Sequence, residues 1–192
     1  MKTGKQKLAG LDDGRSVFIG SEKVANVADH PAFRNAARTV AAIYDMKAAP
    51  ENKESMTFEA DGERHSMYYL QARSAADLEK RMSIHRGIAD MTFGMFGRSP
   101  DYFASFVTGM SLVPDLFGPY SRNIQSYFKF MRDRDVFAAH AVVPPQGSRD
   151  PAYYQRANKE TQACRVVRED DDGLVVSGMK MLATAAVLAD EE

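Results

Sequence analysis

The chain has 192 residues, of which 44% are hydrophobic, and a formal net charge of −1 at pH 7. This composition excludes an intrinsically disordered chain, and the near-neutral charge provides no basic surface for nucleic acid or for an anionic membrane. The single cysteine, Cys164, excludes an internal disulfide and any cysteine-based metal or iron–sulfur site built by this chain alone. Because the N-terminus lacks the apolar run of a signal peptide and no segment is long enough to span a bilayer, we expect a cytoplasmic protein.

The first third of the sequence predicts two hairpins on either side of a helix. Residues 16–26 are predicted to form a short hairpin that turns at Gly20-Ser21. A helix should open at Asp29-His30-Pro31 and run to about Lys47, because apolar residues recur along one face at helical spacing. A second hairpin is predicted from strands at 56–58 and 67–70, with a turn between them at Asp61-Gly62.

Three further helices are predicted before residue 135. The first begins at the capping-box pattern of Ser74 and continues to the glycine at position 97. The second begins at Ser99-Pro100-Asp101, where serine can cap, proline suits the first helical position and aspartate complements the helix dipole, and it ends at Pro114. The third follows Gly118-Pro119. We therefore expect residues 1–135 to form a mainly helical domain.

The pattern changes at residue 136. The nearly continuous apolar run 136–143, followed by two prolines, predicts a buried strand, and antiparallel strands are predicted at 164–167, 174–176 and 179–185. The fold class is therefore α+β, with a partial β domain at 136–192. Three or four strands without closure leave exposed edges, so we expect a truncated chain or a partner that completes the sheet.

Arg98 and Tyr102 lie one helical turn apart at the start of a predicted helix, where a guanidinium and a phenol could hold an anion. The alternative is an ordinary helix start. His140 is the polar residue of the apolar run 136–143, and a buried imidazole needs hydrogen-bond partners. It is either a core histidine bound to a backbone carbonyl or a residue of a functional site.

The polar loop after His140 offers Gln146, Ser148 and Arg149, whose donors suit a heterocycle edge or a phosphate, although an ordinary solvated turn has the same composition. Thr184 lies in an apolar segment, where its hydroxyl needs a partner, most commonly a backbone carbonyl. The other histidines have no metal-ligand spacing and are interpreted as structural or exposed, and no metal site is predicted; they are His30, His65 and His85.

Three separated motifs occur in an order that resembles the oxygenase component family of 4-hydroxyphenylacetate 3-monooxygenase. They are Asp29-His30-Pro31-Ala32-Phe33-Arg34-Asn35-Ala36-Ala37, Gly97-Arg98-Ser99-Pro100-Asp101-Tyr102 and Val176-Ser177-Gly178-Met179-Lys180. The resemblance implies an acyl-CoA dehydrogenase-like architecture, in which an N-terminal helical domain precedes a β-barrel-like middle domain and a C-terminal helical bundle, usually as a homotetramer. The resemblance ends inside the middle domain, so we expect the bundle to be missing from this chain.

The resemblance also implies a chemistry. Members of the family use FADH2 from a separate flavin reductase, form a C4a-hydroperoxide with O2 and hydroxylate a phenol ortho to its hydroxyl group. The residues that would surround the phenol oxygen and the peroxide are Arg98, Tyr102 and His140. The implied flavin contacts are Gln146, Gly147, Ser148, Arg149 and Thr184.

Two other functions stay open at this stage. The chain could be a non-catalytic truncated paralogue or split subunit that keeps the helical domain for assembly, with a second chain supplying the C-terminal part. The related 4-hydroxybutyryl-CoA dehydratases share the fold and FAD but bind an iron–sulfur cluster through cysteines near the position of Arg98. This chain has no cysteine there, which makes the dehydratase function the poorest of the three.

Overall fold

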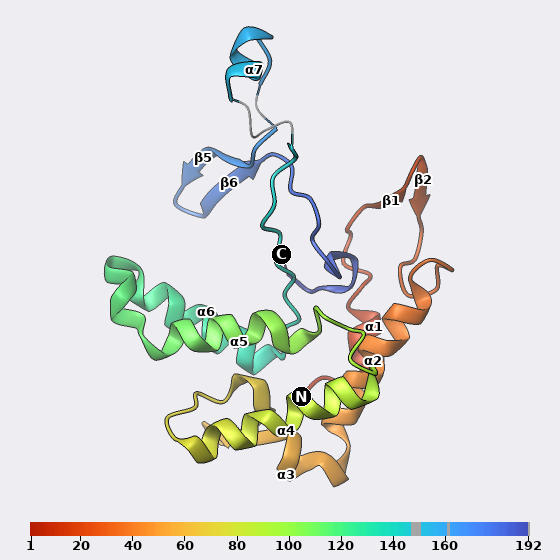
Figure 1. Ribbon diagram of the computed structural model, residues 1–192, viewed down its shortest axis with the longest axis vertical. Coiled ribbons are helices and arrows are strands. Elements are labelled where there is room, and N and C mark those ends of the chain that lie inside the picture. The colour runs from red at the N-terminus through yellow and green to blue at the C-terminus, as the bar shows by residue number, and fades with distance from the viewer. Residues whose placement is uncertain (147–150, 161, 192) are drawn as a thin grey trace.

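The computed structural model describes residues 1–146, 151–160 and 162–191 (Figure 1). Four helices form most of a compact body, and the elements of the last third project from it. The four helices are α2 (Arg34–Ala48), α4 (Ala75–Met91), α5 (Pro100–Leu112) and α6 (Ser121–Arg134). None of the helices in the described ranges is both long enough and apolar enough to cross a membrane.

Both predicted hairpins of the first third are confirmed, with one strand displaced. The first pairs β1 (Val17–Ile19) with β2 (Glu22–Val24), and the second pairs β3 (Thr57–Ala60) with β4 (Glu63–Ser66). The strand predicted at 67–70 was wrong, because these residues form the 3-10 turn η2 (Met67–Tyr69). Tyr68 and Tyr69 are both fully buried, which the alternating side chains of a strand facing solvent on one side would not allow.

The predicted helices are confirmed with different ends. α2 begins at Arg34, because the carbonyl of His30 accepts hydrogen bonds from the backbone N–H groups of residues 33 and 34 in a preceding turn. α4 begins where predicted, with the Ser74 hydroxyl accepting from the Asp77 N–H, but ends at Met91 instead of residue 97. Residues 93 and 94 adopt left-handed conformations (φ 53° and 69°), which stop the helix.

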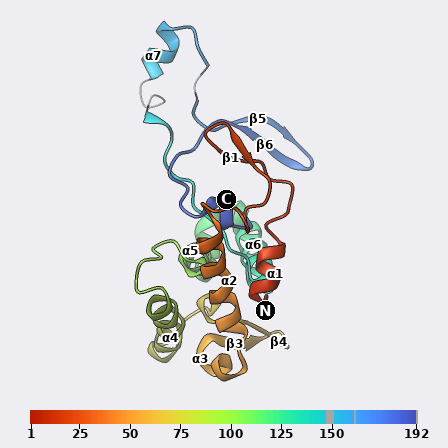
Figure 2. The ribbon, with the colours of Figure 1, turned by 90° about the vertical axis from the view of Figure 1, so that its right-hand side faces the viewer.

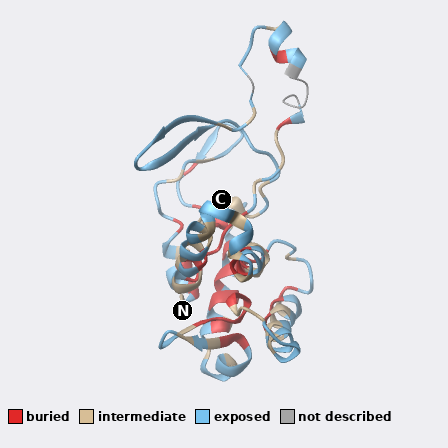
Figure 3. Cartoon of the chain, turned by 90° about the vertical axis from the view of Figure 1, so that its left-hand side faces the viewer, coloured by how far each residue is buried: buried red, intermediate tan, exposed pale blue. Residues whose placement is uncertain are grey.

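Short elements connect these helices. α2 leads into η1 (Pro50–Asn52) and α3 (Lys53–Met56), which precede the β3–β4 hairpin, and η3 (Pro114–Tyr120) joins α5 to α6. Buried side chains gather in the helical body (Figure 3). One core cluster joins η2, α4, α5 and α6, and a second joins α2 to both ends of the chain; its members include Leu11, Val24, Val40, Tyr44, Phe137 and Leu188.

The strand predicted at 136–143 was wrong. Residues 136–143 are all described, and they form an extended segment with only isolated bridges, between Ala138 and Glu191 and between Val143 and Met181. The side chains of 136–139 are buried because the helices cover them, so their apolar character reflects helix packing instead of sheet neighbours. A continuous apolar run alone does not distinguish these two environments.

The antiparallel strands predicted at 164–167 and 174–176 are confirmed as β5 (Arg165–Asp170) and β6 (Gly173–Ser177), a two-stranded hairpin. The strand predicted at 179–185 was wrong, because positive φ angles at Leu182 and Ala185 turn the chain into η5 (Ala186–Leu188). The helix α7 (Pro151–Arg156) was not predicted. Every β6 residue is exposed, so the hairpin has no core face within the described chain.

A buried ion pair ties three parts of the helical body together. The Lys47 ammonium at the end of α2 donates to Asp135 Oδ1 (2.8 Å), the Ser66 hydroxyl (3.0 Å) and the Tyr68 hydroxyl (2.6 Å). The same carboxylate oxygen accepts from both hydroxyls, and the ammonium lies 3.9 Å from the centroid of the Tyr44 ring. The Lys47 side chain is 0% exposed, so a completely desolvated charge depends on this network.

A second ion pair joins the two ends of the chain. Lys7 in α1 (Gly4–Ala9) and Lys2 both bind the Asp190 carboxylate, Lys2 at 2.9 Å, and Asp190 also accepts from the Phe137 N–H. Burial lowers the pKa of Lys7 to about 8, although Asp190 opposes the shift. The C-terminal segment is therefore anchored on α1 as well as on the core.

Gly4 is required where α1 meets α2 (Figure 2). A Cβ at this position would overlap the Ala41 carbonyl oxygen and lie 2.5 Å from an Asp45 carboxylate oxygen. We expect Gly4→Ala to lower the free energy of unfolding by about 1–3 kcal/mol in urea unfolding, because the two helices would have to separate. Gly10→Ala is the control, since its Cβ would meet nothing closer than 3.5 Å. Equal losses in both variants would contradict the close-contact explanation.

Candidate functional site

The site is built on the first turn of α5. Pro100 occupies the first helical position as predicted, and Ser99 occupies the N-cap. The predicted capping role of the Ser99 side chain was wrong, because its hydroxyl donates to the Asp101 carboxylate and no side-chain cap bond forms. Asp101 therefore organises this turn, and its negative charge complements the positive end of the helix dipole.

Arg98 and Tyr102 lie against each other, as their spacing predicts. The guanidinium carbon of Arg98 is 3.9 Å from the centroid of the Tyr102 ring, which is a stacked cation–π arrangement. Arg98 is exposed and Tyr102 is half-buried, so the stacked pair presents a positive charge at the surface of the helical body. A guanidinium that lies over a ring face keeps N–H groups that can bind an anion.

His140 joins this pair from the extended segment after α6. Its ring centroid lies 6.4 Å from that of Tyr102, 5.4 Å from that of Phe103 and 6.0 Å from that of Phe106. His140 is exposed, which excludes the first of its two interpretations, a core histidine. The structure thus brings Arg98, Tyr102 and His140 together beside an aromatic surface.

The two segments nominated for flavin contacts are paired with each other. The Met181 N–H donates to the Val143 carbonyl at 2.7 Å, three residues before Thr184 and Gln146 respectively. Both of these side chains are exposed, and Thr184 lies in a turn instead of a strand. The other nominated residues, Gly147, Ser148 and Arg149, lie outside the described residues.

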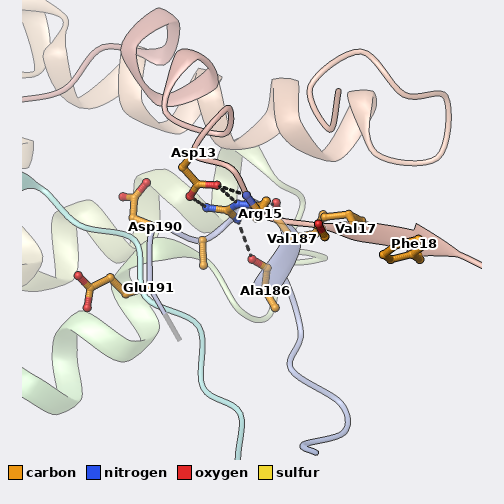
Figure 4. A pocket seen from close by; sticks show the side chains of 10 residues that line it. Asp13, Arg15, Val17, Phe18, Ala186, Val187, Asp190 and Glu191 are labelled. Atoms are coloured by element: carbon orange, nitrogen blue, oxygen red, sulfur yellow. Dashed lines mark hydrogen bonds and ion pairs between the residues drawn. The ribbon is translucent and has the colours of Figure 1, made fainter. Parts of the chain in front are cut away.

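A cavity of about 480 Å³ lies beside the turn that follows Thr184 (Figure 4). Arg15 Nη1 reaches across it and donates to the carbonyls of Ala186 (3.3 Å) and Val187 (3.2 Å). Asp13 holds the guanidinium from the other side, through Nε at 2.8 Å. The segment before β1 therefore fixes the backbone of η5 close to Thr184.

Sequence reasoning missed two parts of the site. The first is the aromatic surface beside Tyr102, in which Phe106 lies four residues after Tyr102 and three after Phe103 and contacts both rings. The pairing of His85 with Asp101, at 2.5 Å from Nδ1 to Oδ2, had no local signal because 16 residues separate them. Among the described residues, no group of three His, Cys, Asp or Glu side chains could hold a metal ion.

Comparison with known proteins places the chain in a family. A family model described as "4-hydroxyphenylacetate 3-hydroxylase N terminal" matches residues 3–192. The oxygenase component of 4-hydroxyphenylacetate 3-monooxygenase from Thermus thermophilus is 36% identical over 184 residues, which are 92% of this chain and 36% of that protein. The FADH2-dependent monooxygenase TftD from Burkholderia cepacia is 33% identical over 99% of this chain and 38% of that protein.

A solved structure agrees with these sequence matches. The crystal structure of the oxygenase component of 4-hydroxyphenylacetate 3-monooxygenase, complexed with FAD and 4-hydroxyphenylacetate, superposes with a TM-score of 0.87 and 33% identity. It covers 98% of this chain and 40% of the solved chain. The chain thus spans well under half the length of the relatives it matches, and it belongs to the 4-hydroxyphenylacetate 3-hydroxylase N-terminal family.

Proposed function

We propose that this chain supplies the phenol-binding part of a reduced-FAD-dependent monooxygenase that hydroxylates a phenol ortho to its hydroxyl group. The observation that carries the proposal is the Arg98 guanidinium stacked on Tyr102, with His140 beside the same ring. The names of the relatives support the cofactor and the reaction class, since one acts on 4-hydroxyphenylacetate and another is FADH2-dependent.

The three side chains have chemically distinct tasks in this proposal. A phenol becomes more nucleophilic at its ortho carbon as its oxygen approaches phenolate, and the fixed charge of Arg98 favours that developing negative charge. Tyr102 and His140 offer hydrogen-bond groups that orient the phenol oxygen beside the guanidinium. Phe103 and Phe106 give the substrate ring an apolar surface on which to pack.

Reduced FAD, when bound, supplies the activated oxygen that the protein side chains lack. The donor chemistry of the two paired segments fits a flavin, because Gln146 carries an amide and Thr184 an exposed hydroxyl that suit the polar edge of a heterocycle. Gly147, Ser148 and Arg149 complete the proposed flavin contacts.

The proposal includes the partners of the reaction. A separate flavin reductase delivers FADH2 and O2 is the co-substrate. The chain either forms a homo-oligomer or binds a second chain that supplies the C-terminal part. Residues 136–192 would begin an antiparallel β-barrel-like domain of acyl-CoA dehydrogenase-like architecture after the helical domain at 1–135. The exposed faces of β5 and β6 support this, because a barrel-like domain would cover one of them. The setting proposed for the reaction is the cytoplasm.

The test supplies 4-hydroxyphenylacetate, O2 and reductase-generated FADH2 to two samples: the 192-residue chain alone, and an oxygenase in which this chain replaces the matching part of a full-length relative. We expect the second sample to form the catechol product and the isolated chain to bind FAD weakly, because His140 and Thr184 are exposed among the described residues. Tight, stoichiometric FAD retention by the isolated chain would contradict this expectation. A folded second sample that forms no catechol with any phenol would instead favour the non-catalytic assembly function.

A further inference from the structure

The helix α4 contacts the first two turns of α5 through two polar contacts. The upper contact joins His85 Nδ1 to Asp101 Oδ2 at 2.5 Å. The lower contact joins Arg81 Nη2 to the Ser105 hydroxyl at 3.1 Å. Because the residues on each helix are four apart and run in opposite directions, the contacts form successive steps of one antiparallel helix pair. The upper contact ends at the turn that carries Arg98 and Tyr102.

Asp101 connects that contact to the stacked pair. One carboxylate oxygen accepts from His85 and the other from the Ser99 hydroxyl, so both oxygens are held. The Tyr102 N–H in turn donates to the Ser99 carbonyl at 3.0 Å. The carboxylate therefore holds the Ser99 side chain on one side of Asp101, a backbone hydrogen bond holds Tyr102 on the other, and Arg98 is the residue directly before this turn.

The local environment strengthens these bonds. The Asp101 side chain is 15% exposed and that of His85 is 28% exposed, so water competes little with the contact. Burial alone would raise the pKa of Asp101, but the hydrogen bonds from His85 and Ser99 lower it overall. The carboxylate stays ionised at neutral pH and accepts charge-assisted hydrogen bonds.

We propose that His85 is a positioning residue, which holds Asp101 so that the first turn of α5 keeps the Arg98 guanidinium stacked on the Tyr102 ring. The lower contact at Ser105 holds the same two helices together without touching the Asp101 carboxylate, and the Ser105 hydroxyl donates only to the Asp101 backbone carbonyl, at 2.7 Å. The consequence for catalysis rests on the proposed function, whereas the stacking itself does not. The Ser105 contact thus serves the packing of the two helices, whereas the His85 contact also places the Arg98 guanidinium.

The experiment measures stacking directly in the protein. A ring stacked at 3.9 Å shifts the Arg98 side-chain proton resonances upfield, and Tyr102→Leu defines the position of these resonances without the ring. We expect His85→Leu to lose more than half of this upfield shift. His85→Asn should restore most of it, because the asparagine amide nitrogen stands near the position of Nδ1 and can donate to Asp101. Ser105→Ala should keep it, because the Asp101 carboxylate retains its contacts with His85 and Ser99 when the Ser105 hydroxyl is removed.

An unchanged upfield shift in His85→Leu would overturn the inference, and so would equal losses in His85→Leu and Ser105→Ala. If His85→Leu does not fold, Asp101→Asn takes its place and must show the same loss. In the oxygenase assembled as above, His85→Leu should lower hydroxylation on the order of tenfold to a hundredfold, since small misplacements of binding groups cost that much. Loss of stacking with normal hydroxylation would refute the proposed role of Arg98 while supporting the positioning role of His85.

Discussion

Lys47→Met will lower the free energy of unfolding by about 3–5 kcal/mol, which is the usual cost of leaving one partner of a buried ion pair without its counter-charge. Asp135 would keep its hydrogen bonds from Ser66 and Tyr68 but lose the ammonium at 2.8 Å. Urea unfolding monitored by circular dichroism measures the loss. Lys129→Met is the matched control, because Lys129 is 63% exposed and pairs with Asp133 at the surface. It should change stability by less than about 0.5 kcal/mol.

The loss in Lys47→Met will shrink as the pH falls. In the native protein, burial acts to raise the pKa of Asp135, but Lys47 lowers it below the ordinary 3.8, so its contribution to stability is complete above pH 3.8 and is lost below it. Without Lys47, burial raises the pKa of Asp135, and the folded variant binds a proton that the unfolded chain releases. The difference in the free energy of unfolding between the wild type and Lys47→Met therefore becomes smaller as the pH falls from 7 to 4. Lys47→Met combined with Asp135→Asn should recover part of the stability at pH 7, and a loss independent of pH would contradict the ion-pair explanation.

Arg98→Ala will lower phenol hydroxylation by about 10²–10³-fold in the assembled oxygenase, the range found when one fixed group that stabilises a developing negative charge is removed. Arg98→Lys will recover only part of the rate, because an ammonium keeps the positive charge but lacks the planar group that stacks on the Tyr102 ring. Arg134→Ala is the matched control. Arg134 lies 4.9 Å from the Phe130 ring on α6, so it is a second arginine–aromatic pair outside the site.

The hydroxylation rate and the product yield per FADH2 consumed are measured for the Arg98 variants. His140→Ala should lower the hydroxylation rate by a similar factor. Wild-type rates and yields in both variants would refute the assignment of this site. A fall in Arg134→Ala as large as that in Arg98→Ala would show that any arginine–aromatic pair in the helical body matters for folding, and that the loss is not specific to the phenol.

The sequence predicted those parts of the fold that depend on neighbours along the chain. Asp61-Gly62 supplied the turn of the second hairpin, and Pro100 and Pro114 marked the start and end of α5 within a few residues. The one-turn spacing of Arg98 and Tyr102 likewise predicted their contact. Each of these depends on backbone geometry that a few residues determine.

The predictions that were wrong concern features that depend on which distant residues pack against a segment. The run at 136–143 is apolar because α5 and α6 pack on its first half. The periodicity of the sequence does not distinguish burial under helices from burial in a sheet. Lys47 and Asp135 are 88 residues apart, and nothing in the pattern of α2 indicated that its last lysine would be fully buried. The domain boundary at 135 and the roles of Gln146, Gly147, Ser148, Arg149 and Thr184 stay predictions.

The ion pair between Lys7 and Asp190 also determines when α1 can pack on the core during synthesis of the protein. The two residues are 183 apart, so α1 leaves the ribosome long before its counter-charge has been made. The Lys7 side chain is 1% exposed in the finished fold, and burying it without Asp190 would leave a desolvated charge unpaired. Final closure of α1 over the core must therefore wait until Asp190 has been made, and a ribosome-bound nascent chain that ends before residue 190 should leave α1 accessible to protease.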